Sequence, residues 1–201
     1  MVTQQEAARI EAALRAAQAR SSGQIVCVLA RASSHYEVMP IVWSALLALA
    51  APWPLLVFTD LAAERIFIAQ LAIFLIAIAA LSLPALRLRL TPRRISRSNA
   101  HRAAIEQFVV RGLTHCAERN GILIYVSLAE RYARILADDG AATAIDQSQW
   151  RAIVDRLTSQ MKKGAVSDAL IGAANECGER LAQHFPPHEA AAPAFQRFHL
   201  L

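Results

Sequence analysis

Two uncharged stretches, IVWSALLALAAPWPLLVF at residues 41–58 and IFIAQLAIFLIAIAALSLPAL at residues 66–86, decide how this chain is organised. The first lies in a run of 22 residues without a charge, and the second is itself a run of 21. A helix of about 20 residues crosses a hydrocarbon core of about 30 Å. Buried core helices seldom reach this length without a charge. We therefore predict a two-helix transmembrane hairpin over residues 38–86, with spans at about 39–58 and 66–86.

The positive charge of the chain lies beside the second stretch. The net charge is +5, and residues 87–102 alone contribute six arginines and no acid. Lys and Arg near the end of a span favour the cytoplasmic side, and the connection between the two stretches holds a single base, Arg65. We therefore predict a multi-pass protein of the inner membrane with both termini in the cytoplasm. The arginines expected to contact anionic headgroups at the membrane surface are Arg87, Arg89, Arg93, Arg94 and Arg97.

Composition and motifs also limit the partners. The chain is 55% hydrophobic and 18% charged, which excludes a disordered, collagen-like or disulfide-scaffold protein. The arginines have no interleaved aromatic residues and match no nucleic-acid reading motif, so we predict no nucleic-acid partner. The expected partners are the lipid bilayer, its anionic headgroups and other membrane proteins.

The residues before the hairpin predict one helix and one strand. Thr3 and Glu6 have the spacing of a capping box at the start of an alanine-rich helix. Residues 24–30 form a β-branched apolar run, which is typical of a strand buried on both faces. A lone strand is not stable, because its backbone groups need a partner. That partner must therefore come from the residues after the hairpin.

The residues after the hairpin predict the rest of one α/β domain. Asn99 is placed to cap a helix over about residues 100–118, and two strands follow at residues 122–127 and 132–137. Two amphipathic helices come next, and residues 186–201 are predicted to be a flexible tail. The expected division is residues 1–37 for the first helix and strand, 38–86 for the hairpin, 87–185 for the remainder of the domain and 186–201 for the tail.

The order of these elements requires an even number of spans. If the strand at residues 24–30 pairs in parallel with the strand at residues 122–127, the crossover between them contains the whole hairpin. An odd number of spans would put the two strands on opposite sides of the bilayer. Two spans are therefore consistent with a single domain.

Three stretches resemble the TPM domain family, whose name joins a thylakoid lumen protein, a photosystem II repair protein and an acetylcholine-receptor modulator. They are SSGQIVCVLA at 21–30, ERNGILIYVSLAERYARILADDG at 118–140 and QWRAIVDRLTSQMKKG at 149–164. The resemblance covers about residues 4–185 without the spans. It implies an α/β fold, a three-layer α/β/α sandwich with a small mixed sheet, here interrupted by the two-helix transmembrane hairpin.

The resemblance also implies what the domain does. Several relatives are associated with the assembly or maintenance of membrane protein complexes, and some have been credited with acid phosphatase activity or calcium binding. In the usual layout a secreted domain precedes a C-terminal anchor. Here the spans interrupt the domain, which puts luminal or periplasmic roles in doubt.

An acidic loop is the candidate for metal chemistry. Asp138 and Asp139 precede Gly140, and Asp146 follows a few residues later. Carboxylate oxygens at the end of a strand suit Ca²⁺ or Mg²⁺, and such an ion could assist phosphoryl transfer. The resemblance places calcium binding or phosphatase chemistry at these same three carboxylates. The alternative is structural, because Asp-Gly is common in turns and Asp146 is suited to cap the next helix.

The remaining reactive residues are predicted to be structural. Cys27, Cys116 and Cys177 are far apart in sequence and lie on apolar faces, so we predict reduced, buried thiols and no metal or disulfide set. Glu130 and Arg131 are predicted to be a solvated pair in the turn between two strands. No cofactor is predicted apart from the candidate Ca²⁺ or Mg²⁺ ion.

Two functions from different classes follow. No GxGxxG, P-loop, HExxH or GxSxG pattern occurs, and the domain is interrupted by its own anchor. The leading prediction is an integral membrane protein whose cytoplasmic domain of the TPM type is a non-enzymatic interaction, assembly or maintenance module for membrane protein complexes. The alternative is a metal-dependent hydrolase, similar to an acid phosphatase, that uses the acidic loop. Whether the chain is an enzyme is left open.

Overall fold

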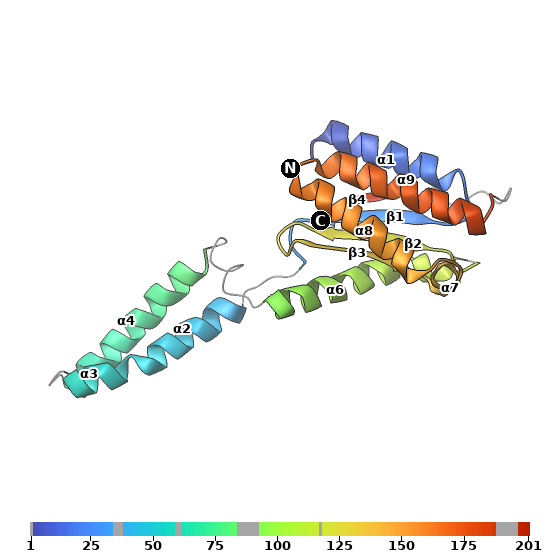
Figure 1. Ribbon diagram of the computed structural model, residues 1–201. Coiled ribbons are helices and arrows are strands. Elements are labelled where there is room, and N and C mark those ends of the chain that lie inside the picture. Colours follow the sequence, from blue (N-terminus) through green and yellow to red (C-terminus); the bar gives the residue numbers. More distant parts are fainter. Residues whose placement is uncertain (1, 34–37, 59–61, 84–92, 117, 188–196) are drawn as a thin grey trace. The chain divides into compact units, whose positions relative to one another are not determined.

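The computed structural model divides the chain into two compact units (Figure 1). The sheet unit contains Met1–Ser33 and Ser98–Leu201, and the hairpin unit contains Ser34–Arg97. Each unit is described by itself. The structure describes residues 2–33, 38–58, 62–83, 93–116, 118–187 and 197–201.

The hairpin unit is built mainly of apolar helices. Helices α2 (Val38–Ala50) and α3 (Pro52–Phe58) are followed by α4 (Ala63–Leu81), and α2 packs along α4. Two 19-residue segments, Pro40–Phe58 and Ala63–Leu81, have mean hydropathies of 2.0 and 2.1, with 11% of each buried. Both are long and apolar enough to cross a membrane.

The helix boundaries differ from the predicted spans. The first segment is interrupted at Ala51, and α3 begins at Pro52, because a proline lacks the backbone N–H that would continue α2. The second helix begins at Ala63, before its expected start, since Glu64 and Arg65 are good helix formers. Residues 84–86 of the predicted span lie outside the described residues.

The sheet unit is built on a mixed sheet with the order β3-β2-β1-β4. Strand β1 (Ile25–Ala30) pairs in parallel with β2 (Ile122–Ser127), and β2 pairs in antiparallel with β3 (Tyr132–Ala137). The positions of these three strands agree with the sequence prediction, and the parallel pairing of β1 with β2 is the arrangement that it considered. The fourth strand, β4 (Phe198–Leu200), pairs in parallel with β1.

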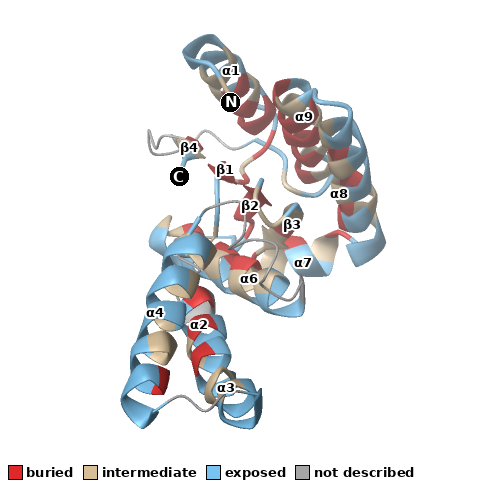
Figure 2. Ribbon diagram, turned by 90° about the vertical axis from the view of Figure 1, so that its left-hand side faces the viewer, coloured by how far each residue is buried: buried red, intermediate tan, exposed pale blue. Residues whose placement is uncertain are grey.

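Helices cover both faces of this sheet and confirm the three-layer α/β/α sandwich (Figures 1 and 2). Residues Ile25, Cys27 and Leu29 of β1 belong to the larger core, and the alternating residues belong to a second core that includes Ala104 and Phe108. This alternation follows from the two-residue period of a strand. The larger core is covered by α1 (Gln4–Gln18), α8 (Gln147–Lys162) and α9 (Val166–His184), and the second by α6 (Arg93–Val110).

The start of α1 confirms the predicted capping box. The Glu6 N–H donates to the Thr3 hydroxyl at 3.3 Å, and the Thr3 N–H donates to the Glu6 carboxylate at 2.7 Å. The carboxylate of Glu6 has a lowered pKa because it accepts hydrogen bonds from the Thr3 N–H and from the Thr3 hydroxyl. Local sequence therefore fixes where this helix begins.

The helix after the hairpin is displaced from its predicted position. It begins at Arg93, so that Asn99 lies inside it and is not its cap, and it ends at Val110. Gly112 follows with a φ of +69°, a left-handed conformation that ends helices. A short 3₁₀ helix, η1 (Leu113–His115), leads from there toward β2.

The prediction of a flexible tail over residues 186–201 is wrong for its end. The Cys27 N–H donates to the Arg197 carbonyl at 2.7 Å, and the Leu201 N–H donates to the Leu29 carbonyl at 3.0 Å. The side chain of Phe198 is 5% exposed. The final residues therefore pair with the outer edge of β1. A strand of three residues is too short to show a hydrophobic period, so the sequence alone could not indicate it.

Candidate functional site

The predicted acidic loop begins with Asp138, a buried residue that caps the helix after it. Asp138 directly follows β3 and is 7% exposed, and its Oδ1 accepts the Asp139 N–H at 2.9 Å at the start of α7 (Asp139–Ala144). Its Oδ2 is buried and has no hydrogen-bond partner among the described residues. A Cβ on Gly140 would lie 2.4 Å from the Glu118 carbonyl oxygen, so this position needs glycine for close packing.

The other two carboxylates have separate partners. Asp139 is exposed and accepts a hydrogen bond from Arg119 at 2.7 Å. Asp146 is exposed at the start of α8 and accepts from the Ser148 hydroxyl at 2.6 Å, which lowers the pKa of Asp146. Within the described part of the chain, no three His, Cys, Asp or Glu side chains form a group that could hold a metal. As placed, these carboxylates do not fit a shared Ca²⁺ or Mg²⁺ ion.

The arginines expected at the membrane surface are only partly described. Arg94 and Arg97 are exposed in the first turns of α6. Arg87 and Arg89 lie outside the described residues, and so does the side chain of Arg93. Contact of these arginines with headgroups therefore stays a prediction.

The cysteines are free thiols. Cys27 and Cys177 are buried, as predicted, and Cys116 is half-buried. Burial raises the pKa of Cys27 to about 12 and also raises the pKa of Cys177 and of Cys116. A thiol that keeps its proton at neutral pH is a poor nucleophile.

Glu130 is not the solvated partner of Arg131 that the sequence predicts. Its half-buried carboxylate accepts the Ser33 N–H at 2.9 Å, the Ser33 hydroxyl at 3.3 Å and the Ser127 hydroxyl. The Tyr125 hydroxyl donates to the Ser33 hydroxyl at 3.0 Å, and burial raises the pKa of Tyr125. Glu130 therefore joins the turn after β2 to the residues after β1.

A groove lies between β3 and α8. It has a volume of about 650 Å³ and is lined along the whole length of β3. One side of α8 forms its other wall, with the apolar Trp150 and Val154 between polar residues. We call this the β3 groove; its α8 wall consists of Gln147, Trp150, Arg151, Val154 and Asp155.

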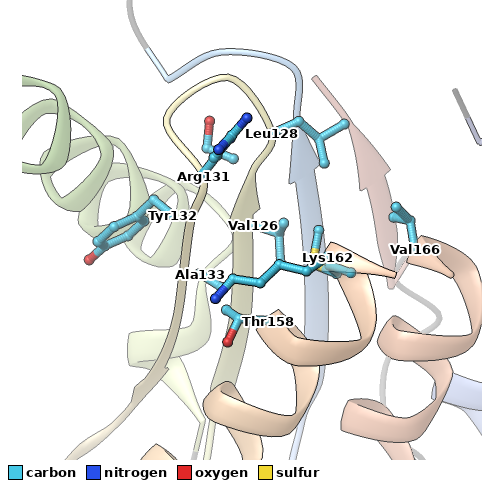
Figure 3. Close-up of a pocket in the computed structure, with 10 residues that line it drawn as sticks. Val126, Leu128, Arg131, Tyr132, Ala133, Thr158, Lys162 and Val166 are labelled. Carbon is cyan, nitrogen blue, oxygen red and sulfur yellow. The ribbon is translucent and has the colours of Figure 1, made fainter. Parts of the chain in front are cut away.

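A second cavity adjoins the β3 groove and has a volume of about 460 Å³. The two share Tyr132 and Ala133, so the second cavity joins the groove at the first residues of β3 and extends from there across the end of β2. Arg131 lines it from the turn before β3, and Lys162 extends toward Ala133 from the end of α8 (Figure 3). We call it the end pocket; its walls also include Val126, Ser127 and Leu128 at the end of β2 and Thr158, Met161 and Val166.

Along its outer edge, the backbone of β3 carries hydrogen-bonding groups that do not pair with another strand of the described sheet. The Ile122 N–H donates to the Gln24 carbonyl at 2.7 Å, on the side of β1. Its cross-strand partner Ala137 therefore points its own N–H and C=O away from β2. By the two-residue period of a strand, Ile135 and Ala133 do the same. Since β3 is the last strand of the described sheet on this side, these groups lie along its open edge, beside the groove that the same residues line.

The side chains around the groove carry an excess of positive charge. Four cations and one carboxylate, Asp155, line the β3 groove and the end pocket, a balance of +3. All four cations are exposed, and none forms an ion pair with another described residue. The four cations are Arg131, Arg134, Arg151 and Lys162.

Sequence reasoning did not find this site. The alternation in β3 predicts a wetter face, but an open edge is a property of strand order, which depends on residues far away in the chain. The usable signal was the spacing of Gln147, Arg151 and Asp155 on one face of α8, where polar residues flank the apolar Val154.

Comparisons with known proteins agree with the fold. Residues 90–180 match the family model described as the TPM domain. A search of curated proteins found no match. A similar solved structure is the NMR structure of the BA42 protein from the psychrophilic bacterium Bizionia argentinensis, at 15% identity and a TM-score of 0.60. The likeness covers 100% of this chain and 95% of that one, and at this identity it shows the fold alone.

Proposed function

We propose that this chain, which contains a TPM domain, is a membrane-anchored docking module that binds other membrane proteins through the β3 groove. The observation that carries the proposal is the open edge of β3 beside the α8 wall. An extended segment that adds to such an edge gains main-chain hydrogen bonds, and the neighbouring side chains select its sequence. We further propose that the module serves the assembly or maintenance of membrane protein complexes.

The charge on the groove supports docking of a partner in preference to non-specific aggregation. Proteins protect exposed sheet edges with charged side chains, because bare edges pair with any other strand. Arg134 lies on β3 itself, and Arg151 faces it from α8. Such an edge disfavours neutral and basic strands and admits a complementary acidic one.

The hairpin unit supports anchoring in the bilayer. Its apolar side chains are exposed, with Phe58 at 83% and Trp53 at 76%, and its helices are mostly pale blue in Figure 2. Water contact with this surface is unfavourable by about 25 cal/mol per Å², and a hydrocarbon core removes that cost. We propose a two-pass protein of the inner membrane with both termini in the cytoplasm, the orientation that the arginines of residues 87–102 favour.

Site-specific photo-crosslinking in native membranes tests the docking role. A photoreactive amino acid at Val154, in the groove, should give adducts with a membrane protein, and the same group at the exposed Glu179 of α9 should not. Adding Ala133→Pro should abolish the adducts, because proline removes an N–H that faces the groove. Adducts that persist in this variant, or that form equally from both positions, would contradict docking at β3.

A phosphatase assay tests the alternative. The purified full-length protein should not hydrolyse p-nitrophenyl phosphate with Mg²⁺ or Ca²⁺. Turnover that disappears in the double variant Asp138→Ala and Asp139→Ala would assign the function to the acidic loop and overturn the docking proposal.

A further inference from the structure

We infer that the ligand of the β3 groove is the C-terminal end of an extended partner chain, with its terminal carboxylate in the end pocket between Arg131 and Lys162. The inference rests on the proposed docking function. It adds the direction of the ligand, its terminal chemistry and the two residues that recognise it.

The direction follows from the position of the end pocket. Strand β3 begins at Tyr132, beside the end pocket, and ends at Ala137. A segment that adds in antiparallel, the slightly more stable arrangement, therefore runs toward Tyr132 with its C-terminal end leading. Its last residue lies beside Tyr132 and Ala133, where the β3 groove meets the end pocket.

Hydrogen-bond donors lie where the β3 groove meets the end pocket, the position that a terminal carboxylate would reach. Side chains of an added strand project above and below the sheet, but its terminal carboxylate continues along the backbone. The Ala133 N–H points outward in this plane, and Lys162 reaches toward Ala133 (Figure 3). Arg131 lines the same pocket from the turn before β3. A backbone N–H and two cations are suited to bind a carboxylate by charge-assisted hydrogen bonds.

Arg131 and Lys162 are available to bind an anionic ligand, because the ion pairs among the described residues of the domain involve other residues. Ion pairs engage Arg9, Arg15, Arg20, Arg119 and Arg156, all outside the groove and the end pocket. Arg131 and Lys162 have no such partner in the described part of the chain. An anion in the end pocket therefore displaces no existing ion pair.

A second copy of the chain fits the groove less well than an acidic partner. Antiparallel pairing of two β3 edges would bring Arg134 and Arg151 of both copies into one interface. Like charges placed together in this way oppose association. The charge balance of +3 instead favours a ligand that carries acidic residues before its terminal carboxylate.

A display experiment tests the inference with the full-length protein in nanodiscs. One library presents random heptapeptides with free C-termini, and a matched library presents the same random segment internally. We expect enrichment only from the free C-termini, with acidic residues before the last position. An enriched peptide, made as the free acid and as the amide, should bind roughly tenfold or more weakly as the amide, because a charged hydrogen-bond acceptor is lost.

Variants assign the carboxylate to its pocket. Lys162→Ala and Arg131→Asn should each weaken the free acid by roughly tenfold and leave the weak binding of the amide unchanged. Asparagine is chosen because Arg131 has a φ of +49°, which asparagine tolerates. Lys163→Ala is the matched control, since Lys163 is the exposed neighbour of Lys162 and does not line the pocket. It should bind both peptides as the unaltered protein does.

The outcomes separate this inference from the docking function. Enrichment of internal acidic segments whose binding is lost in Ala133→Pro would overturn the terminal carboxylate and leave docking intact. Selected peptides unaffected by Ala133→Pro would overturn both. The circular dichroism spectrum of the Ala133→Pro variant must match that of the unaltered protein. Arg134→Pro is the contrasting variant: it removes an N–H that faces β2 and should unfold the sheet. Self-association that Ala133→Pro abolishes would identify a second copy as the occupant and overturn the inference.

Discussion

The carboxylate of Glu130 holds together two parts of the chain that are 97 residues apart. Ser33 is the last residue of the sheet unit before the hairpin unit, and Glu130 accepts its N–H. Removal of this carboxylate leaves the Ser33 N–H and the Ser127 hydroxyl without their acceptor. Glu130 therefore fixes the end of β1 at the point where the chain leaves the sheet.

Glu130→Ala should lower the free energy of unfolding by about 1–3 kcal/mol, because partly buried donors lose a charged acceptor. Glu130→Gln should cost less, since the amide oxygen still accepts one hydrogen bond. Urea unfolding followed by circular dichroism measures both. Glu179→Ala is the control, because Glu179 is exposed and its only ion pair among the described residues spans 4.0 Å. Equal losses for Glu130→Ala and Glu179→Ala would show that the network contributes nothing.

The stability of the protein should fall at alkaline pH because of the buried thiol of Cys27. Burial raises its pKa from an ordinary value of 9.0 to about 12. The folded state therefore holds this proton more tightly than the unfolded chain does. The contribution is complete below pH 9 and is lost as the pH rises toward 12. Urea unfolding at pH 8, 9.5 and 11 should show a steeper decline for the unaltered protein than for Cys27→Ala. Identical pH dependence of the two proteins would contradict the assignment.

At the scale of elements, the contact between α1 and α9 depends on one glycine. A Cβ on Gly178 would lie 2.8 Å from the Cβ of Ala17, which is closer than two such atoms approach. Gly172 lies in the same helix, and a Cβ there would meet only the Gln160 side chain at 3.7 Å. The same substitution at the two positions therefore changes packing at one position only.

Gly178→Ala should destabilise the protein by roughly 1 kcal/mol or more, because overpacking outweighs the better helix propensity of alanine. Gly172→Ala should stabilise it by about 0.5–1 kcal/mol, since only the propensity changes. Thermal unfolding of both variants gives the sign directly. Stabilisation by Gly178→Ala would mean that α1 moves away from α9 at little cost.

Sequence alone predicted the elements whose signal is local. The capping box of Thr3 and Glu6 and the strands at residues 122–127 and 132–137 are examples, because burial and capping repeat within a few residues. Strand β4 escaped prediction because its stability comes from β1, not from its own three residues. The predicted start of α6 was also wrong. The predicted solvated pair of Glu130 and Arg131 was wrong because Glu130 binds Ser33, which is 97 residues away in the chain.

For the candidate site, too, the sequence predicted individual residues but not the contacts between distant parts of the chain. The sequence located the acidic residues but not their partners: Asp139 pairs with Arg119 and Asp146 with Ser148. It also located Arg131, but not the cavity that Arg131 shares with Lys162. Cavities depend on the arrangement of elements, which a motif search cannot provide.

At the scale of the whole molecule, the proposed topology makes a clear prediction. Reporter fusions at Ala62, between the two apolar helices, and at Gly140, in the sheet unit, should report opposite sides of the membrane. The reason is the arginine excess of residues 87–102, which favours the cytoplasm for the sheet unit. Alkaline phosphatase and green fluorescent protein fusions measure the two sides. If both positions report the same side, the two-pass topology is wrong.

In the proposed two-pass topology, the parallel pairing of β1 with β2 couples the assembly of the sheet to the insertion of both apolar helices. During synthesis β1 emerges first and stays without its central partner until both apolar helices and β2 have been made. In a bilayer, a chain that inserted only one helix would keep β1 and β2 in different aqueous compartments, and its unpaired strands would stay open to proteases and chaperones. Under the proposed topology, a molecule that has inserted only one of its two apolar helices therefore cannot present the β3 groove on a finished sheet.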